Sequence, residues 1–135
     1  YGIAPGRVTL WGTGKPLREF LWSEEMADAS VHVLLNVDFK DTYDATAQEV
    51  RNCHINVGSG REIAIKDLAE KIKAAVGFEG EIVWDSSKPD GTPRKLTDVK
   101  KLHALGWHHR IEIDEGIQRL FDWYRAGIGA AAATR

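Results

Sequence analysis

The stretch VTLWGTGKPLREFLW, residues 8–22, sets two short apolar segments on either side of a glycine turn. Residues 8–11 alternate between apolar and polar side chains as a strand does, and an extended pattern resumes over residues 18–22. The Gly-Thr-Gly of residues 12–14 supplies the backbone freedom that a tight reversal needs. The stretch therefore predicts two short strands joined by a turn.

The rest of the chain mixes short strands irregularly with helices. Ser23 is predicted to cap a helix that ends near Asn36, and the apolar alternation at residues 54–57 predicts another strand. Three further helices and one more strand are expected: helices from about Lys66 to Gly77, from Asp98 to Gly106 and from Asp114 to about residue 125, and a strand at residues 81–84. This order predicts a small α+β unit with about four helices, and not a complete doubly wound sheet.

The composition excludes several classes of protein. With 135 residues, 43% of them hydrophobic, the chain can bury one core. Eighteen basic and 20 acidic side chains give a net charge of −2, so we expect no nucleic-acid partner and no attraction to an anionic membrane. The sequence has no apolar stretch near the roughly 20 residues that span a bilayer. The single cysteine, Cys53, cannot form an internal disulfide, and we expect a soluble, cytoplasmic protein.

Two glycine turns invite comparison with loops that bind phosphate. Residues 12–14 and 58–60 both follow strand-like segments. Neither completes G-x-G-x-x-G or the longer pattern that ends in Gly-Lys-Ser/Thr, since Leu17 and Ile63 occupy positions where glycine is needed. We interpret both as plain turns.

The cysteine and the histidines also lack the arrangement that catalysis or metal binding requires. Cys53 and His54 are neighbours on a predicted strand, where their side chains would point to opposite faces. We expect a packed thiol and a surface or capping imidazole. A second group of histidines has neither the i, i+4 spacing nor the carboxylate of a helical zinc site, and no metal is expected. It comprises His103, His108 and His109.

The string KPDGTPRK, residues 88–95, concentrates charge in a rigid turn. Its two prolines fix φ and its Asp90-Gly91 pair favours a tight turn, but turn chemistry does not explain the cations. A solvated connection and an anion-binding loop are both open interpretations. The same holds for Trp11 and Arg18, which could stack a planar ring and clamp a phosphate, or serve as a core aromatic and a surface cation.

Four segments resemble, in unbroken order, the carboxyl-terminal part of the GDP-L-fucose synthase family of extended short-chain dehydrogenases. They are residues 8–21, 54–60, 85–96 and 105–107, and the resemblance covers about residues 8–125. The string at residues 88–95 is much more specific than either glycine turn.

The resemblance implies an NADP-dependent enzyme that converts GDP-4-keto-6-deoxy-mannose to GDP-L-fucose by C3 and C5 epimerisation and C4 reduction. In the family, an amino-terminal Rossmann domain binds NADP and carries the catalytic residues. This chain has no G-x-x-G-x-x-G and no Tyr-x-x-x-Lys. We therefore expect the substrate-binding domain alone, without the Rossmann domain, inactive by itself and with no cofactor of its own. Full-length relatives are usually homodimers, through a surface that belongs mostly to the missing domain.

The resemblance also implies a domain division and a binding site. Residues 1–7 would be the remnant of an upstream segment, residues 8–125 the nucleotide-sugar-binding domain and residues 126–135 a flexible tail. The residues expected to contact the GDP-sugar are Trp11, Arg18, Asp90 and Lys95. Arg18 would counter the diphosphate charge, Trp11 would line the nucleotide pocket, and Asp90 and Lys95 would complete its nucleotide side. The alternative is a non-catalytic module that binds nucleotides or phosphate.

Overall fold

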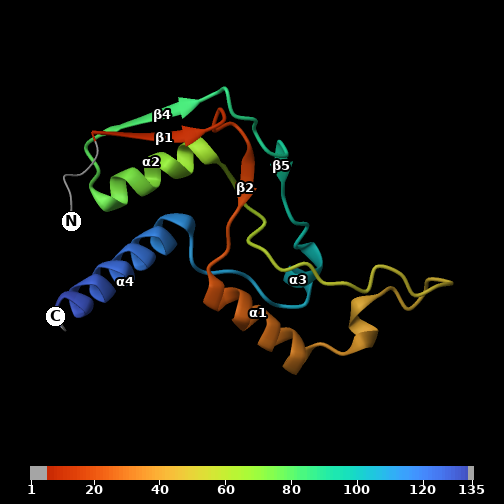
Figure 1. Ribbon diagram of the computed structural model, residues 1–135. Helices are drawn as coiled ribbons and strands as arrows, with labels where there is room; N and C mark the ends of the chain where they lie inside the picture. The colour runs from red at the N-terminus through yellow and green to blue at the C-terminus, as the bar shows by residue number, and fades with distance from the viewer. Residues whose placement is uncertain (1–5, 134–135) are drawn as a thin grey trace. The chain divides into compact units, whose positions relative to one another are not determined.

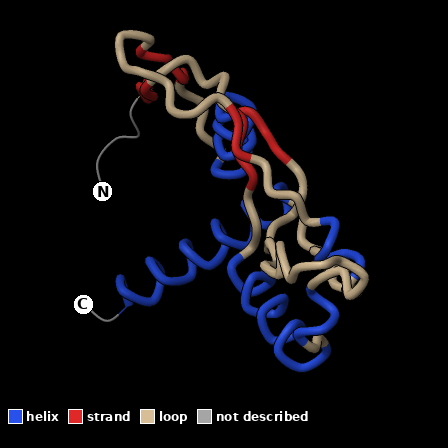
Figure 2. The backbone as a smooth tube through the Cα atoms, turned by 90° about the vertical axis from the view of Figure 1, so that its right-hand side faces the viewer, coloured by secondary structure: helices blue, strands red, loops and turns tan. Residues whose placement is uncertain are grey.

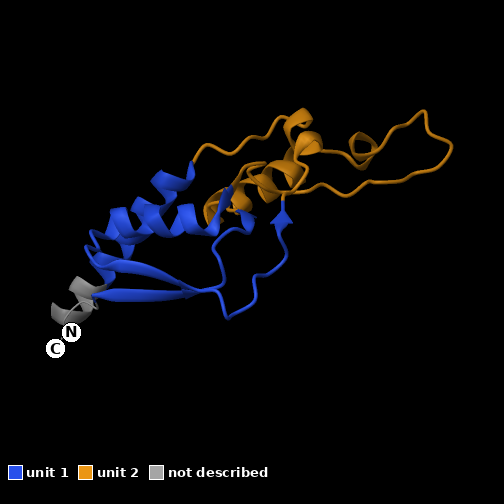
Figure 3. Cartoon of the chain, turned by 90° about the horizontal axis from the view of Figure 1, so that it is seen from above, with its two compact units in different colours: residues 1–18, 63–95, 112–135 blue, residues 19–62, 96–111 orange. Residues whose placement is uncertain are grey.

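The structure, a computed structural model, describes residues 6–133, which form helices, short strands and long connecting loops (Figure 1). These residues divide into two compact units (Figure 3). The sheet unit comprises residues 6–18, 63–95 and 112–133, and the helical unit comprises residues 19–62 and 96–111. No helix in the described part of the chain is long and apolar enough to cross a membrane. Most of the predicted upstream remnant, residues 1–7, lies outside the described residues.

A pair of parallel strands forms the main sheet of the sheet unit. Strand β1 (Arg7–Trp11) pairs with β4 (Glu81–Asp85), in a register that sets Arg7 opposite Glu81 and Trp11 opposite Asp85. Parallel strands need a long crossover connection, and helix α2 (Ile65–Val76) is part of it (Figure 1). A smaller sheet has the strand order β3-β2-β5. Its strands are β2 (Leu17–Glu19), β3 (Glu62–Ala64) and β5 (Arg94–Lys95).

Two helices complete the sheet unit. Helix α4 (Ile113–Ala133) packs against α2, and the Lys71 Nζ atom lies 2.6 Å from Asp114 Oδ1. Helix α2 ends at Gly77, whose φ of +66° confirms the predicted stop. Helix α4 continues well beyond residue 125, where the sequence analysis expected the helix to end. Its last turns are rich in alanine, the strongest helix former, which explains the extra length.

The helical unit is built around a small apolar core. It contains helix α1 (Ser23–Asn36), a 3₁₀ turn η1 (Phe39–Thr42) and the short helix α3 (Lys100–Ala104). Ala29 and Leu102 are fully buried in the core, and Trp107 is 5% exposed. The Trp107 indole donates a hydrogen bond to Asp28 Oδ2 at 2.8 Å, so its polar atom is satisfied. Four half-buried side chains surround this core: Leu21, Val33, Ile55 and Val57.

A buried carboxylate fixes the approach of the chain to α1. Glu25 is 3% exposed and lies in the first turn of α1, where the helix dipole favours a negative charge. It accepts hydrogen bonds from the Arg110 amide at 2.6 Å and from the Ile111 amide at 3.2 Å. These bonds compensate the cost of removing the charge from water. The segment after Trp107 is thereby held against the start of α1.

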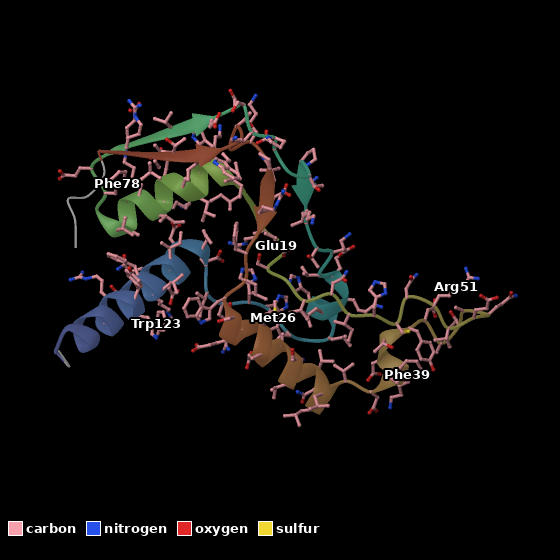
Figure 4. The ribbon with its side chains drawn as sticks, in the orientation of Figure 1. Glu19, Met26, Phe39, Arg51, Phe78 and Trp123 are labelled. Atoms are coloured by element: carbon pink, nitrogen blue, oxygen red, sulfur yellow. The ribbon has the colours of Figure 1, made fainter. Side chains whose placement is uncertain are left out.

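A second carboxylate, Glu19, joins three segments of the helical unit (Figure 4). It accepts hydrogen bonds from the Gly60 amide at 2.6 Å, the Thr97 amide at 3.0 Å and the Ser59 hydroxyl at 3.4 Å. Burial by itself would raise the pKa of Glu19, but the hydrogen bonds from Thr97, Gly60 and Ser59 together lower it below its ordinary value. Glu19 therefore stabilises the fold as a carboxylate.

The predicted fold class is confirmed, whereas some predicted elements are wrong. The described residues form four α-helices and short strands, the latter shown in red in Figure 2. Residues 54–57 form no strand: Ile55 and Val57 pack on the core, which produces the alternation without any ladder. Ser23 is already helical, with Trp22 at the N-cap position and no side-chain capping bond. Strands β3 and β5 were not predicted.

We predict that Leu102→Ala destabilises the helical unit by about 2–5 kcal/mol, because the substitution leaves a cavity in a fully buried site. Urea denaturation measures the free energy of unfolding. Leu34→Ala is the matched control, since Leu34 is 81% exposed and its loss should cost less than about 0.5 kcal/mol. Equal costs for the two variants would show that the core is elsewhere.

Glu19→Gln should destabilise the protein in a pH-dependent way. Because the pKa of Glu19 is lowered in the folded state, its contribution is present above the ordinary value of 4.5 and is lost as the pH falls through the folded-state pKa. The difference in unfolding free energy between wild type and Glu19→Gln should therefore be largest near neutral pH and shrink in acid. Glu70→Gln, on an exposed position of α2, is the control for the loss of one carboxylate. A pH-independent difference for Glu19→Gln would contradict the assignment.

Candidate functional site

The glycine turn after β1 is packed on both sides. Gly12 and Gly14 have φ values of +81° and +70°, a left-handed backbone that glycine adopts without strain. The Gly14 carbonyl accepts a hydrogen bond from the Lys66 amide at 2.9 Å. A Cβ atom at Gly14 would lie 2.7 Å from the Trp84 ring. The tight turn predicted at residues 12–14 is present, and its two glycines are needed.

Two loops leave the sheet from the same edge. Trp11, the last residue of β1, is opposite Asp85, the last residue of β4, and the Gly12 amide donates to the Asp85 carbonyl at 2.9 Å. Because parallel strands end at a common edge, the loops at residues 12–16 and 86–93 begin side by side (Figure 1). In open parallel sheets this carboxyl edge is the usual place for a ligand.

Asp90 fastens the second loop to the glycine turn. The Thr13 amide donates to Asp90 Oδ1 at 2.8 Å, and the Thr13 hydroxyl donates to Asp90 Oδ2 at 2.5 Å. These two bonds are called here the Thr13–Asp90 clasp. The Thr13 hydroxyl and amide, with a smaller effect of Lys15, hold the pKa of Asp90 below its ordinary value. Each oxygen keeps lone pairs for a further donor.

Trp11 is an exposed aromatic beside a cation. Its side chain is 76% exposed, so the interpretation of Trp11 as a core residue is wrong. The Lys88 ammonium lies 5.6 Å from the centroid of the Trp11 ring, within the range of a cation–π interaction worth about 0.5–1 kcal/mol at an exposed site. An exposed indole with a cation nearby can stack a planar base and attract negative charge.

Arg18 and Lys95 place two positive charges at paired positions. They are register partners in the parallel pair β2–β5, and paired residues project from the same face of a sheet. The Arg18 guanidinium donates to the Leu17 carbonyl at 2.6 Å and lies 3.1 Å from where a Cβ of Gly91 would be. Lys95 has no ion-pair partner within the described residues. Like charges at paired positions are unfavourable, and an anion between them would relieve this repulsion.

All four predicted site residues lie in the sheet unit. Lys88 lies over the Trp11 ring, and Thr13, two residues after Trp11, donates to Asp90, so Trp11 and Asp90 lie near each other. Arg18 and Lys95 are register partners. Sequence reasoning missed Thr13, whose hydroxyl and backbone amide both donate hydrogen bonds to Asp90. The donor groups of Thr13 in a glycine turn are visible in the sequence and could have indicated a role. Their acceptor, Asp90, is 77 residues away, so the partner could not be identified.

The second glycine turn, residues 58–60, also holds a carboxylate of the chain. The Gly60 amide donates to Glu19 at 2.6 Å, as the Thr13 amide of the first turn donates to Asp90. In both turns a backbone amide thus donates to a carboxylate of the chain itself. In a phosphate-binding loop the same amide would donate to the ligand.

Cys53 and the histidines differ in part from their predictions. Cys53 is exposed, so the prediction of a packed thiol is wrong, because residues 54–57 form no strand that would bury it. His54 is on the surface, as predicted. The rings of His103 and His108 stack at 4.2 Å, and burial, followed by the charges of its histidine neighbours, lowers the pKa of His103. The part of the chain that the structure describes contains no group of three His, Cys, Asp or Glu side chains suited to a metal ion.

Comparison with known proteins places this site in a family context. The model of the NAD dependent epimerase/dehydratase family matches residues 3–58. GDP-L-fucose synthase 1 of Arabidopsis thaliana is 47% identical over 121 residues, which are 90% of this chain and 34% of the relative. GDP-L-fucose synthase of Escherichia coli (strain K12) is 44% identical over 117 residues, 87% of this chain and 36% of the relative. The chain thus spans about a third of the length of these relatives.

Solved structures agree with the sequence comparison. A GDP-6-OMe-4-keto-L-xylo-heptose reductase from C. jejuni is 42% identical, with a TM-score of 0.82 over 90% of this chain and 34% of that one. The GDP-mannoheptose C4 reductase of Campylobacter jejuni, solved with NADP bound, is 42% identical, with a TM-score of 0.76 over 88% and 35%.

The fold agrees with the family model: residues 3–58 of this chain match the NAD dependent epimerase/dehydratase family, and the reductase structure superposes on 90% of the chain. The chain is similar, over nine-tenths of its length, to one third of a GDP-L-fucose synthase. The resemblance stated from the sequence motifs is confirmed.

We predict that Gly12→Ala breaks the Thr13–Asp90 clasp. An added Cβ would lie 2.3 Å from Asp90 Oδ1, which must move away. Gly77→Ala is the matched control: it carries the same left-handed strain, about 1–2 kcal/mol, but a Cβ there meets nothing within 4 Å. Gly12→Ala should lose at least as much unfolding free energy as Gly77→Ala. Hydrogen exchange of the Thr13 amide should accelerate in Gly12→Ala alone, and unchanged protection in that variant would contradict the contact.

Proposed function

We propose that this chain is the GDP-sugar-binding part of an NADP-dependent enzyme that makes GDP-L-fucose from GDP-4-keto-6-deoxy-mannose by epimerising C3 and C5 and reducing C4. The observation that carries the proposal is the set of cations and the exposed indole around the carboxyl edge of the parallel strands. The 47% identity to GDP-L-fucose synthase 1 of Arabidopsis thaliana supports the choice of substrate.

The chain's own residues would bind and orient the GDP-sugar. Arg18 can donate two parallel hydrogen bonds to a phosphate, and Lys95 adds a second positive charge on the same face. Trp11 offers an exposed ring for the base. Asp90 can accept from a ribose hydroxyl or a purine edge with the lone pairs that Thr13 leaves available. These contacts would hold the diphosphate and base while the sugar extends to the catalytic residues.

NADP does not fit the glycine turns of this chain. A pyrophosphate needs free backbone amides and a close approach to glycine, but the Thr13 and Gly60 amides are donated to Asp90 and Glu19. A Cβ at Gly12 or at Gly58 would meet one of these carboxylates within 2.5 Å, so the space beside the turn is filled. We therefore assign NADP binding and the chemistry of hydride transfer and epimerisation to the remainder of a longer protein, in a Rossmann domain outside this chain.

The remaining parts of the proposal concern assembly and location. The whole protein would be a homodimer whose contact surface belongs mostly to that Rossmann domain. Its location would be the cytoplasm, an inference that rests on the single exposed cysteine, Cys53.

The test is GDP affinity, measured by calorimetric titration of the chain with GDP and GDP-mannose. We expect Arg18→Ala to weaken GDP binding roughly 10- to 100-fold, the loss expected when charge-assisted hydrogen bonds to a phosphate are removed. The titration is repeated in a hybrid enzyme, the Escherichia coli GDP-L-fucose synthase with its matching third replaced by this chain. In the hybrid, NADPH oxidation with GDP-4-keto-6-deoxy-mannose is a second readout.

Arg7→Ala is the matched control, because Arg7 is an exposed arginine of the same unit that pairs with Glu81 at the far end of β1. Its GDP affinity should stay within twofold of wild type. Equal GDP affinity of wild type and Arg18→Ala in the hybrid would reject the site. Equal binding of unrelated polyanions, with a steep decline in salt, would instead support a non-catalytic anion-binding module.

A further inference from the structure

The loop at residues 86–93 is exposed along its whole length, yet it is anchored at three points. At its start, Asp85 accepts hydrogen bonds from the Ser87 amide at 3.0 Å and the Ser87 hydroxyl at 2.6 Å. At its end, the Pro93 carbonyl accepts from the Leu17 amide at 2.9 Å. The Thr13–Asp90 clasp is the anchor between them. Without it, the middle of the loop would be tied to the sheet unit by weaker contacts.

The residues on either side of Asp90 are the ones that face the candidate ligand groups. Lys88, two residues earlier, lies over the Trp11 ring at 5.6 Å. Gly91, the next residue, lies against the Arg18 guanidinium. A Cβ atom added at Gly91 would be only 3.1 Å from Arg18 Nη2. Asp90 thus lies in the sequence between Lys88, which contacts the Trp11 ring, and Gly91, which contacts Arg18. A movement of Asp90 would displace both.

We propose that Thr13 is a positioning residue for nucleotide-sugar binding, and that it acts through Asp90 to hold Lys88 beside Trp11 and Gly91 beside Arg18. The proposal rests on the proposed function and goes beyond it, because it gives Thr13 a role and gives Asp90 an internal role beside its contact with the ligand. Two anchored ends leave the loop several conformations, and a third anchor removes that entropy before the ligand arrives. The ligand then meets a preformed wall.

The electrostatics of the clasp agree with this role. Asp90 is held by two donors and by the charge of Lys15, so it remains a carboxylate under ordinary conditions. A charge-assisted hydrogen bond of this kind is roughly twice as strong as a neutral one. The carboxylate also makes the glycine turn repel phosphate. A diphosphate is therefore directed away from the turn and toward Arg18 and Lys95.

The experiment compares Thr13→Val, which removes the hydroxyl but keeps the branched shape, with Thr13→Ser, which keeps the hydroxyl. We expect Thr13→Val to weaken GDP binding by about three- to tenfold, because removal of one of the two bonds of the clasp makes the loop less pre-organised. Thr13→Ser should stay within twofold of wild type. Both are measured in the 135-residue chain and in the hybrid enzyme, by calorimetry. Thermal unfolding of both variants should match wild type, because the clasp is exposed.

A double-mutant cycle with Asp90→Ala separates positioning from direct contact. If Thr13 acts through Asp90, Thr13→Val causes no further loss of GDP affinity in the Asp90→Ala background. Carbon NMR of the Asp90 carboxyl gives a readout that needs no ligand: its pKa should rise in Thr13→Val and stay low in Thr13→Ser. Should Thr13→Val fail to fold, the pair Asp90→Ala and Asp90→Asn tests the same link, since only asparagine can still accept from the Thr13 amide.

The outcomes separate this proposal from the proposed function. Wild type that fails to bind GDP in the chain and in the hybrid enzyme overturns both. Wild type that binds GDP, with Thr13→Val binding equally well, overturns the positioning role alone. Additive losses in the cycle would show that Thr13 does not act through Asp90 and would also overturn the positioning role.

Discussion

Five residues of parallel pairing between β1 and β4 determine where the candidate site can form. The pairing joins segments more than 70 residues apart, and its register sets the ends of the two strands opposite each other at Trp11 and Asp85. A shift of one residue would turn every side chain of β1 to the other face. It would also separate the glycine turn from the loop at residues 86–93, and neither Thr13 nor Lys88 would then meet its partner.

A second constraint recurs in both units: a carboxylate of the chain occupies each Gly-x-Gly turn. Asp90 binds the turn at residues 12–14, and Glu19 binds the turn at residues 58–60. Turns with several amides pointing inward attract anions in general, and a phosphate loop uses this property on a ligand. Here the anion is internal, so the same local geometry gives stability. A glycine turn is therefore informative about ligands only when the neighbouring carboxylates are known.

The sequence predicted the features that depend on near neighbours. The stop of α2 at Gly77 and the turn at residues 12–14 are local, because a left-handed backbone selects glycine at the position itself. Strands β3 and β5 were missed since two or three residues carry no period, and they exist only because β2 pairs with them. The strand predicted at residues 54–57 is absent, because packing on a core produces the same alternation as a ladder. The link from Thr13 to Asp90 could not be predicted, because it follows from the register of β1 on β4.

The candidate site belongs to one unit, which matters for how it could work. Trp11, Thr13, Arg18, Asp90 and Lys95 all lie in the sheet unit, so their mutual geometry depends on strand pairing and on the Thr13–Asp90 clasp. Arg18 and Lys95 are like charges at paired positions of β2 and β5, an arrangement that is unfavourable where the charged groups are close. Asp90, the carboxylate of the neighbouring loop, is held by Thr13. The clasp thereby anchors the middle of the loop at residues 86–93 beside the strand ends that carry the candidate site.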